Sequence, residues 1–337
     1  MPDDAIVRLD DAPAIPGLVF RHFRDRSDFA ALVAVIEACQ EFDQVDPLSS
    51  EAGLPTLAEL EQSFSEADNI DLATDMLLVS LEDRVIGFQW VRWWEQADGT
   101  WVYYHRGRVV PDMRNRGIGM ATMHWAERRI RALVKQHGSQ GKAVYRANAT
   151  SHEASYNQLL LEQGYVPVHS FVELGYDHAA PLPEKAVPDG FTFKPASADQ
   201  FRLIWEANEE AFEEEWGHRR ATDEDYIIFL GNVVSNPGFD PALWQIAWRD
   251  DAIAGVALCE ITERGVGEIS ELSVRQTWRN HGLGRSLLIH ALHALKARGL
   301  EHVRIFTDVE HARRLYESVG FRALTEYIRY QKPVEIR

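Results

Sequence analysis

Cysteine is scarce in this sequence, and its two cysteines form no recognisable metal or redox motif. Cys39 and Cys259 are the only cysteines among 337 residues, and neither a CxxC pair nor a Cys/His cluster is present. A disulfide framework and a structural zinc site are therefore excluded as organising features. The composition indicates a protein of the reducing cytoplasm, and we expect no metal cofactor.

Long apolar runs and an excess of basic charge are missing as well. No apolar stretch approaches the roughly 20 residues that a helix needs to span a bilayer, and the first residues lack the regions of a signal peptide. The net charge of −17 disfavours nonspecific binding to nucleic acid or anionic lipid. It is compatible with a cationic small acceptor, or simply with solubility. We expect a globular protein without nucleic-acid or membrane partners, long enough for two domains.

What the sequence does contain is an internal repeat. The stretch "DMRNRGIGMATM" begins at Asp112, and "TWRNHGLGRSLL" begins at Thr277, nearly half the chain later. Each follows an apolar, β-branched run and precedes a long helical pattern. A hairpin pattern precedes each copy, and a strand, a helix and a Gly-aromatic pair follow. The chain is predicted to be a tandem repeat of an α/β (α+β) unit with the order β-α-α-β-β-β-α-β-α-β.

A proline-rich segment separates the two copies. It reads "DHAAPLPEKAVPD" from Asp177 to Asp189, a composition typical of a linker with limited flexibility. The predicted ranges are 1–177 for an N-terminal domain, 178–188 for the linker and 189–337 for a C-terminal domain.

Each repeated stretch has the features of a phosphate cradle. Glycines between a strand and a helix let the backbone approach a ligand, and the first-turn N–H groups and the helix dipole attract anions. The alternative for a single GxG is an ordinary tight turn. A P-loop needs GxxxxGK[ST], which is absent, and the hairpin pattern before each cradle differs from the βαβ context of a dinucleotide fingerprint.

The pattern Val-x-x-x-x-Arg-x-x-Gly-x-Gly resembles the acetyl-CoA pyrophosphate signature of the GNAT acetyltransferase superfamily. It begins at Val109 and again at Val274, and "ARRLYESVGF", from Ala312, is similar to the superfamily's second motif. The resemblance covers nearly the whole chain. It implies two tandem GNAT domains, each a mixed, mostly antiparallel sheet with a splayed central strand pair and flanking helices. It also implies acyl transfer from acetyl-CoA, or another short acyl-CoA, to an amine.

The resemblance assigns cofactor-binding roles by position. In the family, the strand before the cradle pairs with the pantetheine arm, and the cradle holds the pyrophosphate. The residues at these positions in the second copy are Leu272, Val274, Arg279, Asn280, His281, Gly282, Leu283, Gly284, Arg285 and Ser286. Those in the first copy are Val109, Arg114, Asn115, Arg116, Gly117, Ile118, Gly119 and Met120.

Two residues of the second copy are candidates for proton transfer, which acyl transfer to an amine requires. Tyr316 lies four residues before Gly320, where family tyrosines act as general acid toward the CoA thiolate; the alternative is a core aromatic. Glu268 lies six residues before Val274. Strand alternation predicts that Glu268, Ser270, Leu272 and Val274 share one face, and that Glu271 has the other. Glu268 is the candidate base; the alternative is a solvent-facing edge glutamate.

The first copy lacks both candidates at the same offsets. Tyr103 occupies the position of Glu268, Leu160 occupies that of Tyr316, and Tyr156 is one helical turn away. We expect an N-terminal domain that is catalytically silent, whether or not it binds acyl-CoA. This asymmetry resembles that of mycothiol synthase-like two-domain acetyltransferases. A noncatalytic acyl-CoA sensor and an enzyme with two active sites are the alternatives.

The acceptor is expected to be a small-molecule amine. The family's acceptor wall corresponds here to an acidic helix and loop, with Trp216 and His218 in the loop. Its carboxylates attract a cationic amine or merely form a solvated face; they are Glu206, Glu209, Glu210, Glu213, Glu214 and Glu215. A monomer and a homodimer both remain open.

Overall fold

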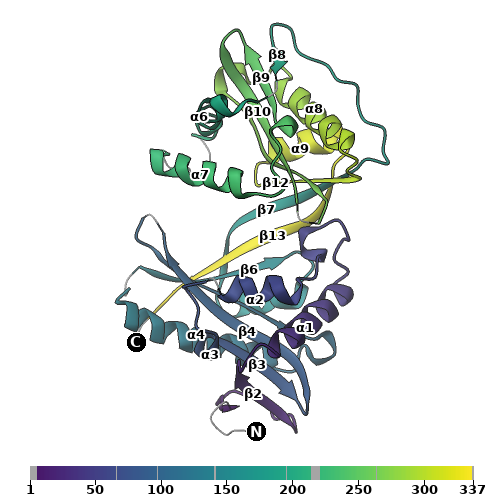
Figure 1. The fold of residues 1–337 in the computed structure, drawn as a ribbon. Coiled ribbons are helices and arrows are strands. Elements are labelled where there is room, and N and C mark those ends of the chain that lie inside the picture. The colour runs from purple at the N-terminus through teal and green to yellow at the C-terminus, as the bar shows by residue number, and fades with distance from the viewer. Residues whose placement is uncertain are drawn as a thin grey trace. The chain divides into compact units, whose positions relative to one another are not determined.

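The computed structural model describes residues 6–65, 67–96, 98–139, 142–194, 196–213, 221–262 and 264–335. These residues form two compact units (Figure 1). The first contains residues 1–171 and 325–337, and the second contains residues 172–324. Both copies of the repeat contain the predicted strands and helices in order, which confirms the tandem α/β plan. The first copy also has a two-residue strand, Ile6–Val7, and a short helix, Leu72–Asp75, that were not predicted. None of the helices in the described ranges has the length and apolarity needed to cross a bilayer.

The sheet of the first unit is mostly antiparallel, with one parallel pair, β5 and β6. Its strands, in spatial order, are β1 (Ile6–Val7), β2 (Leu18–His22), β3 (Met76–Leu81), β4 (Arg84–Glu95), β5 (Trp101–Val109), β6 (Ala143–Thr150) and β13 (Arg322–Pro333). Its helices are α1 (Asp28–Phe42), α2 (Leu57–Ser65), α3 (Leu72–Asp75), α4 (Ile118–His137) and α5 (Ala154–Glu162).

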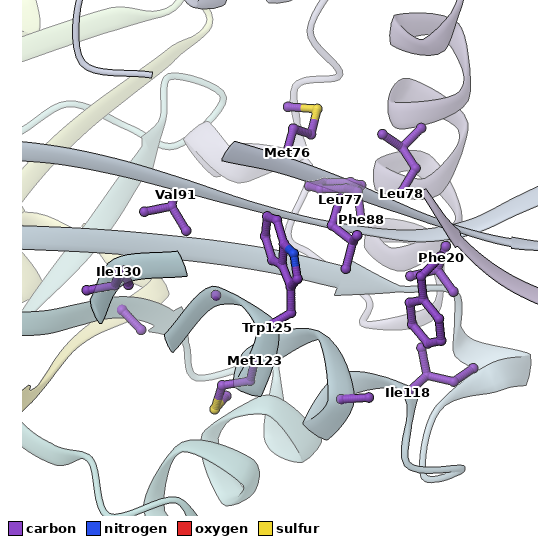
Figure 2. Packing of buried hydrophobic residues seen from close by; sticks show 14 of the residues in the cluster. Phe20, Met76, Leu77, Leu78, Phe88, Val91, Ile118, Met123, Trp125 and Ile130 are labelled. Atoms are coloured by element: carbon purple, nitrogen blue, oxygen red, sulfur yellow. The ribbon is translucent and has the colours of Figure 1, made fainter. Parts of the chain in front are cut away.

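Helix α4 supplies one side of the core of the first unit. Its residues Ala126, Ile130 and Leu133 are buried at helical spacing, so that one face of the helix joins the core of this unit. Figure 2 shows Trp125 pointing from α4 toward the strands that carry Leu77 and Phe88. This packing fixes the start of α4, which is the first cradle, relative to the end of β5.

The sheet of the second unit repeats this arrangement. Its strands, in spatial order, are β7 (Val166–Asp177), β12 (His302–Thr307), β11 (Gly267–Val274), β10 (Ala252–Ile261), β9 (Gln245–Arg249) and β8 (Thr192–Lys194). Helices α8 (Leu283–Ala297) and α9 (Glu310–Val319) join the core on one face. Helix α6 (Phe201–Phe212) and residues of α7 (Asp223–Ser235) pack on the other face. The two faces of this sheet therefore carry separate hydrophobic clusters.

Each copy of the repeat gives its last strand to the other unit. Residues 172–177 of β7 pair with β12, and residues 327–333 of β13 pair with β6 (Figure 1). The compact units therefore differ from the predicted ranges 1–177 and 189–337 at both ends. The physical reason is that the hydrophobic pattern of a terminal strand predicts that the strand is buried but does not determine which strand it pairs with.

The proline-rich segment 178–188 packs within the second unit along α8. The carbonyl of Pro183 accepts from Nε2 of His293 at 2.9 Å, and the carbonyl of His178 accepts from Nζ of Lys296 at 3.1 Å. Ser286 donates to the carbonyl of Ala186. The segment that the sequence marks as a linker is thus bound to the helix that begins at the second cradle.

Candidate acyl-CoA and acyl-transfer site

The two cradles have the same backbone conformation. Asn115 and Asn280 adopt left-handed φ values of 59° and 63°, and Gly117 and Gly282 follow at 83° and 76°. Each glycine is the N-cap of the following helix, α4 or α8, without a side-chain cap. The first-turn N–H groups of two long helices thus remain available to an anion. The glycines are needed here because other residues are strained at this φ.

The arginine of each cradle stabilises the loop itself. Nε of Arg114 donates to the carbonyl of Val109, and Nε of Arg279 donates to that of Val274, both at 3.1 Å. The Arg114 guanidinium also forms a bidentate pair with Asp43, the second contact being 2.8 Å. Because these donors already have protein partners, the first role of each arginine is to tie the cradle to the preceding strand.

The other predicted cradle residues divide into exposed and engaged side chains. Arg116, His281 and Met120 are exposed near the helix starts, whereas Ile118 and Leu283 are buried in the two cores. Arg285 donates to the Ser318 hydroxyl at 2.8 Å. Backbone N–H groups, rather than a ring of free cations, therefore provide most of the attraction for an anion.

The central strands splay apart in both units. Strands β11 and β12 pair from Gly267 to Ile269 only, although β11 continues to Val274. Strands β5 and β6 pair from Trp101 to Tyr104, and β5 continues to Val109. Leu272 and both valines thus lie on the unpaired part of their strands. An extended ligand can pair with these backbone groups as an added strand.

A cavity of about 340 Å³ lies at the first cradle. The cradle, the end of β5 and helix α5 form its walls, and its lining includes Gly107, Arg108, Val109, Arg114, Asn115, Gly117, Gly119, Met120, Tyr156 and Leu159. A Cβ atom on Gly119 would lie 3.4 Å from Leu159, so a larger residue would crowd this wall. Shape, glycines and free N–H groups thus fit a phosphate-bearing ligand.

The side-chain alternation predicted for β11 is wrong, because the strand contains a β-bulge. Leu258 pairs with Glu271 and Cys259 pairs with Ile269, which leaves Ser270 as the extra residue. The bulge reverses the alternation. Glu268 therefore faces the same side as Glu271, toward the α6 layer, whereas Leu272 and Val274 face the α8 layer.

Glu268 is held by an ion pair. Its Oε2 accepts from Nε of Arg304, on the adjacent strand β12, at 2.6 Å, and both side chains are largely buried. Glu260, on β10, lies directly opposite Glu268 in the strand register. Sequence reasoning did not identify Arg304 or Glu260. Arg304 is brought to Glu268 by strand pairing across more than 30 residues, and Glu260 is placed opposite Glu268 by the bulge.

Tyr316 lies on α9 and is only 5% exposed. Its neighbour Leu315 is 3.5 Å from the place where a Cβ on Gly284 would be, so α9 packs directly against the second cradle. Leu159 makes the same contact with Gly119 in the first unit. This equivalence puts Leu160 at the position of Tyr316, as the sequence predicts.

The counterpart of Glu268 in the first unit is Tyr104 rather than Tyr103. Gly87 on β4 pairs with Val109 as Gly255 on β10 pairs with Val274. The residue five positions after Gly87 pairs with Tyr104, and the residue five positions after Gly255 pairs with Glu268. Strand β5 pairs with β4 without a bulge. Tyr103 faces the core instead, where its hydroxyl lies 2.8 Å from Ser139.

The strands of the first unit bear buried cations where the second has Glu271. Arg106 occupies that register position and forms a bidentate pair with Glu153 at 2.8 and 2.9 Å. Arg108 contacts Glu51 at 3.2 Å. Burial raises the pKa of Glu153, but the charges of Arg106 and Arg108 outweigh this and lower it to about 2. Sequence reasoning missed this cluster.

His105, next to Arg106 on β5, is a fully buried titratable group of the first unit. Its Nδ1 lies 3.2 Å from Nε2 of Gln89, and its Nε2 lies 2.7 Å from the Tyr165 hydroxyl. Burial lowers its pKa to about 4, so the ring is neutral at pH 7. Both nitrogens are occupied, which makes His105 part of the core rather than a base.

The acidic wall is only partly within the described ranges. Glu206 pairs with Arg202, and Glu210 pairs with Arg275. Glu209 is partly exposed on α6, and Glu213 is exposed at its end. Glu214, Glu215, Trp216 and His218 lie outside the described residues. Within those ranges, no group of three or more His, Cys, Asp or Glu residues is placed to hold a metal ion.

Known proteins are similar to this chain in sequence. The model of the acetyltransferase (GNAT) family matches residues 201–321. A mycothiol acetyltransferase of Thermomonospora curvata is 30% identical, with 94% of this chain and 97% of that protein covered. One of Thermobispora bispora is 27% identical over 90% and 96% of the two chains.

Solved structures show the same fold. A GCN5-related N-acetyltransferase from Sphaerobacter thermophilus superposes with a TM-score of 0.73 at 24% identity, covering 96% of this chain and 97% of that chain. A tandem GNAT protein from the clavulanic acid biosynthesis pathway gives 0.63 at 16% identity, covering 95% and 99%.

Proposed function

Because the chain belongs to the GNAT family of acetyltransferases, we propose that its second unit transfers an acetyl group from acetyl-CoA, or another short acyl-CoA, to the primary amine of a small molecule. The proposal rests on one contrast between the units. The second has a carboxylate, Glu268, on the splayed strand and a phenol, Tyr316, on the helix that packs against its cradle. The first has Tyr104 and Leu160 at these positions.

Glu268 is the base in this proposal. An amine is protonated near pH 7 and cannot attack until it loses a proton, which a carboxylate takes directly or through a water. The ion pair with Arg304 fixes the orientation of Glu268. The bulge at Ser270 turns the carboxylate toward the α6 layer, which forms the acceptor side.

Tyr316 is the acid. When bound, acetyl-CoA supplies the acetyl group and a thiol leaving group. A phenol beside the cradle can give its proton to the departing sulfur, because a tyrosine hydroxyl carries its proton at neutral pH. The position of α9 against Gly284 keeps this residue close to the start of α8.

The first unit binds acyl-CoA without turning it over. Its cavity and cradle fit the ligand, as described above. The Arg106–Glu153 pair lies on the face where Glu268 would act, and its carboxylate remains ionised and engaged. A cationic acceptor gains nothing from buried arginines at that face. Leu160 offers no proton.

The acceptor in this proposal is a small-molecule amine. The names of the similar proteins point to a mycothiol-type amine as the first acceptor to test. Cys39 and Cys259 are free and buried, which supports a cytoplasmic enzyme.

Replacing Tyr316 by Phe tests the proposal. We expect the rate of CoA release with an amine acceptor to fall by about 10²- to 10⁴-fold, because the general acid is lost while the ring still packs. The matched control is Tyr156→Phe in the first unit, which should leave turnover near that of the wild type. Wild-type rates in Tyr316→Phe, or no turnover with any amine despite tight CoA binding, would contradict the proposal; the latter would favour a sensor.

A further inference from the structure

Two carboxylates occupy directly opposed positions on the acceptor side of the second sheet. Glu260 on β10 and Glu268 on β11 are partners in the antiparallel register, so their Cα atoms are about 4.5–5.5 Å apart and their side chains share a face. Both side chains are partly buried. Two like charges at this spacing repel each other unless something compensates them.

The two carboxylates have different partners. Glu268 accepts from the Arg304 guanidinium at 2.6 Å, so its ionised form is directly compensated. Glu260 accepts from the neutral amide of Asn236, at the end of α7. Phe239 forms an isolated backbone bridge with Glu260. The pair is therefore asymmetric, with one compensated and one uncompensated member.

The surroundings of Glu260 favour its protonated form. Burial and then the charge of Glu268 raise its pKa, and the Asn236 hydrogen bond and Arg304 oppose this only in part. Asp240, one residue beyond Phe239, is paired with Arg298. Glu271, farther along β11 on the same face, is opposite Leu258 instead. The charges that act on Glu260 are thus mainly those of Glu268 and Arg304.

We propose that Glu260 supports the catalytic base Glu268, and that the proton which Glu268 removes is shared between the two carboxylates. Glu268, which is paired with Arg304, removes the proton from the acceptor's ammonium group and shares it with Glu260. The neutral amine then forms a C–N bond with the thioester carbonyl, the C–S bond breaks, and the departing thiolate takes the Tyr316 proton. The nitrogen loses its second proton to the Tyr316 phenolate, which leaves a neutral amide and the CoA thiol, and the proton held by the carboxylates goes to solvent when the product leaves. Glu260 acts through Glu268 and is a positioning residue. This inference rests on the proposed function.

Glu260→Gln tests the inference through the pH profile. The amide keeps the shape of the side chain and removes the like charge, so Glu268 beside Arg304 becomes a weaker base. We expect the acidic limb of kcat/KM to move to lower pH and kcat at pH 7 to fall by about tenfold, less than the roughly 10²- to 10⁴-fold loss typical when a proton-transfer group itself is removed. The probes are acetyl-CoA with cysteine methyl ester or glucosamine, and loss of acetyl-CoA is followed by chromatography.

The matched control is Glu310→Gln, which removes one exposed carboxylate from α9 in the same unit. It should keep the wild-type rate and pH profile. A second readout is the ¹³C NMR titration of the glutamate carboxyl groups. One carboxyl with a raised pKa should be seen in the wild type and disappear in Glu260→Gln, whether or not an acceptor has been found.

The outcomes separate this inference from the proposed function. If Glu260→Gln keeps the wild-type limb and rate while Glu268→Gln abolishes turnover, Glu268 acts alone and only the inference is overturned. The absence of a glutamate with a raised pKa from the NMR titration overturns it as well. If neither Glu268→Gln nor Tyr316→Phe changes turnover, the proposed function itself is wrong.

Discussion

The two units are the same fold with different chemistry on one strand. Both have left-handed Asn and Gly residues in the cradle, an arginine bound to the strand carbonyl and a splayed strand pair. They differ at the bulge of Ser270, which is present in β11 and absent from β5. One extra residue turns Glu268 toward the α6 layer, so the two units share the cradle and differ in the side chains on the neighbouring strand.

Cradle variants should break this comparison most strongly. Gly282→Glu introduces a side chain and a negative charge at a left-handed position where the pyrophosphate is expected to bind. We expect turnover to fall by more than about 100-fold. The equivalent change in the first unit, Gly117→Glu, should leave turnover intact and reduce the number of CoA molecules bound per chain from two to one.

Calorimetry with CoA and steady-state kinetics on both variants measure these effects, and circular dichroism confirms folding. If Gly117→Glu abolishes turnover in a folded protein, the first unit is not silent and the comparison fails.

A stability measurement sharpens the comparison next. Glu153→Gln leaves Arg106 buried without its ionised partner, and breaking such a pair costs about 3–5 kcal/mol. Because the pKa of Glu153 is lowered in the folded state, its stabilising effect is complete above the unfolded value and is lost as pH falls toward 2.

We therefore expect the unfolding free energies of wild type and Glu153→Gln to differ near pH 7 and to converge in acid. Urea unfolding at several pH values measures this. Glu310→Gln, in the other unit, serves as the surface control. A constant difference down to pH 2 would show that the ion pair is not its source.

The smallest effect should come from the acidic end of α6. Glu213 is exposed there, and an exposed charge contributes at most about 1 kcal/mol to attracting a cation. Glu213→Gln should raise the KM for the acceptor no more than about fivefold and leave kcat unchanged. The effect should weaken as salt is added. A change in kcat instead would place Glu213 in the chemistry.

The sequence was most informative where local patterns determine the structure. The repeated glycines predict both cradles, and the offset from Gly320 to Tyr316 predicts that Leu160 replaces it. The sequence-based prediction was wrong about the side of the sheet that Glu268 faces and about which residue of the first unit corresponds to it. A bulge changes side-chain direction without leaving a distinct residue pattern, so alternation could not reveal it. Arg304 and Glu260 are brought to Glu268 by strand pairing, which depends on the tertiary fold.

The exchanged strands have a consequence for how this protein is made. Strand β6 is synthesised long before its neighbour β13, with about half of the chain in between. At typical rates of about 5–20 residues per second, the edge of β6 waits on the order of ten seconds or more for its partner. The order of translation therefore makes the first unit the last to be completed, and a premature stop in the final strand would leave both halves present and the first sheet open.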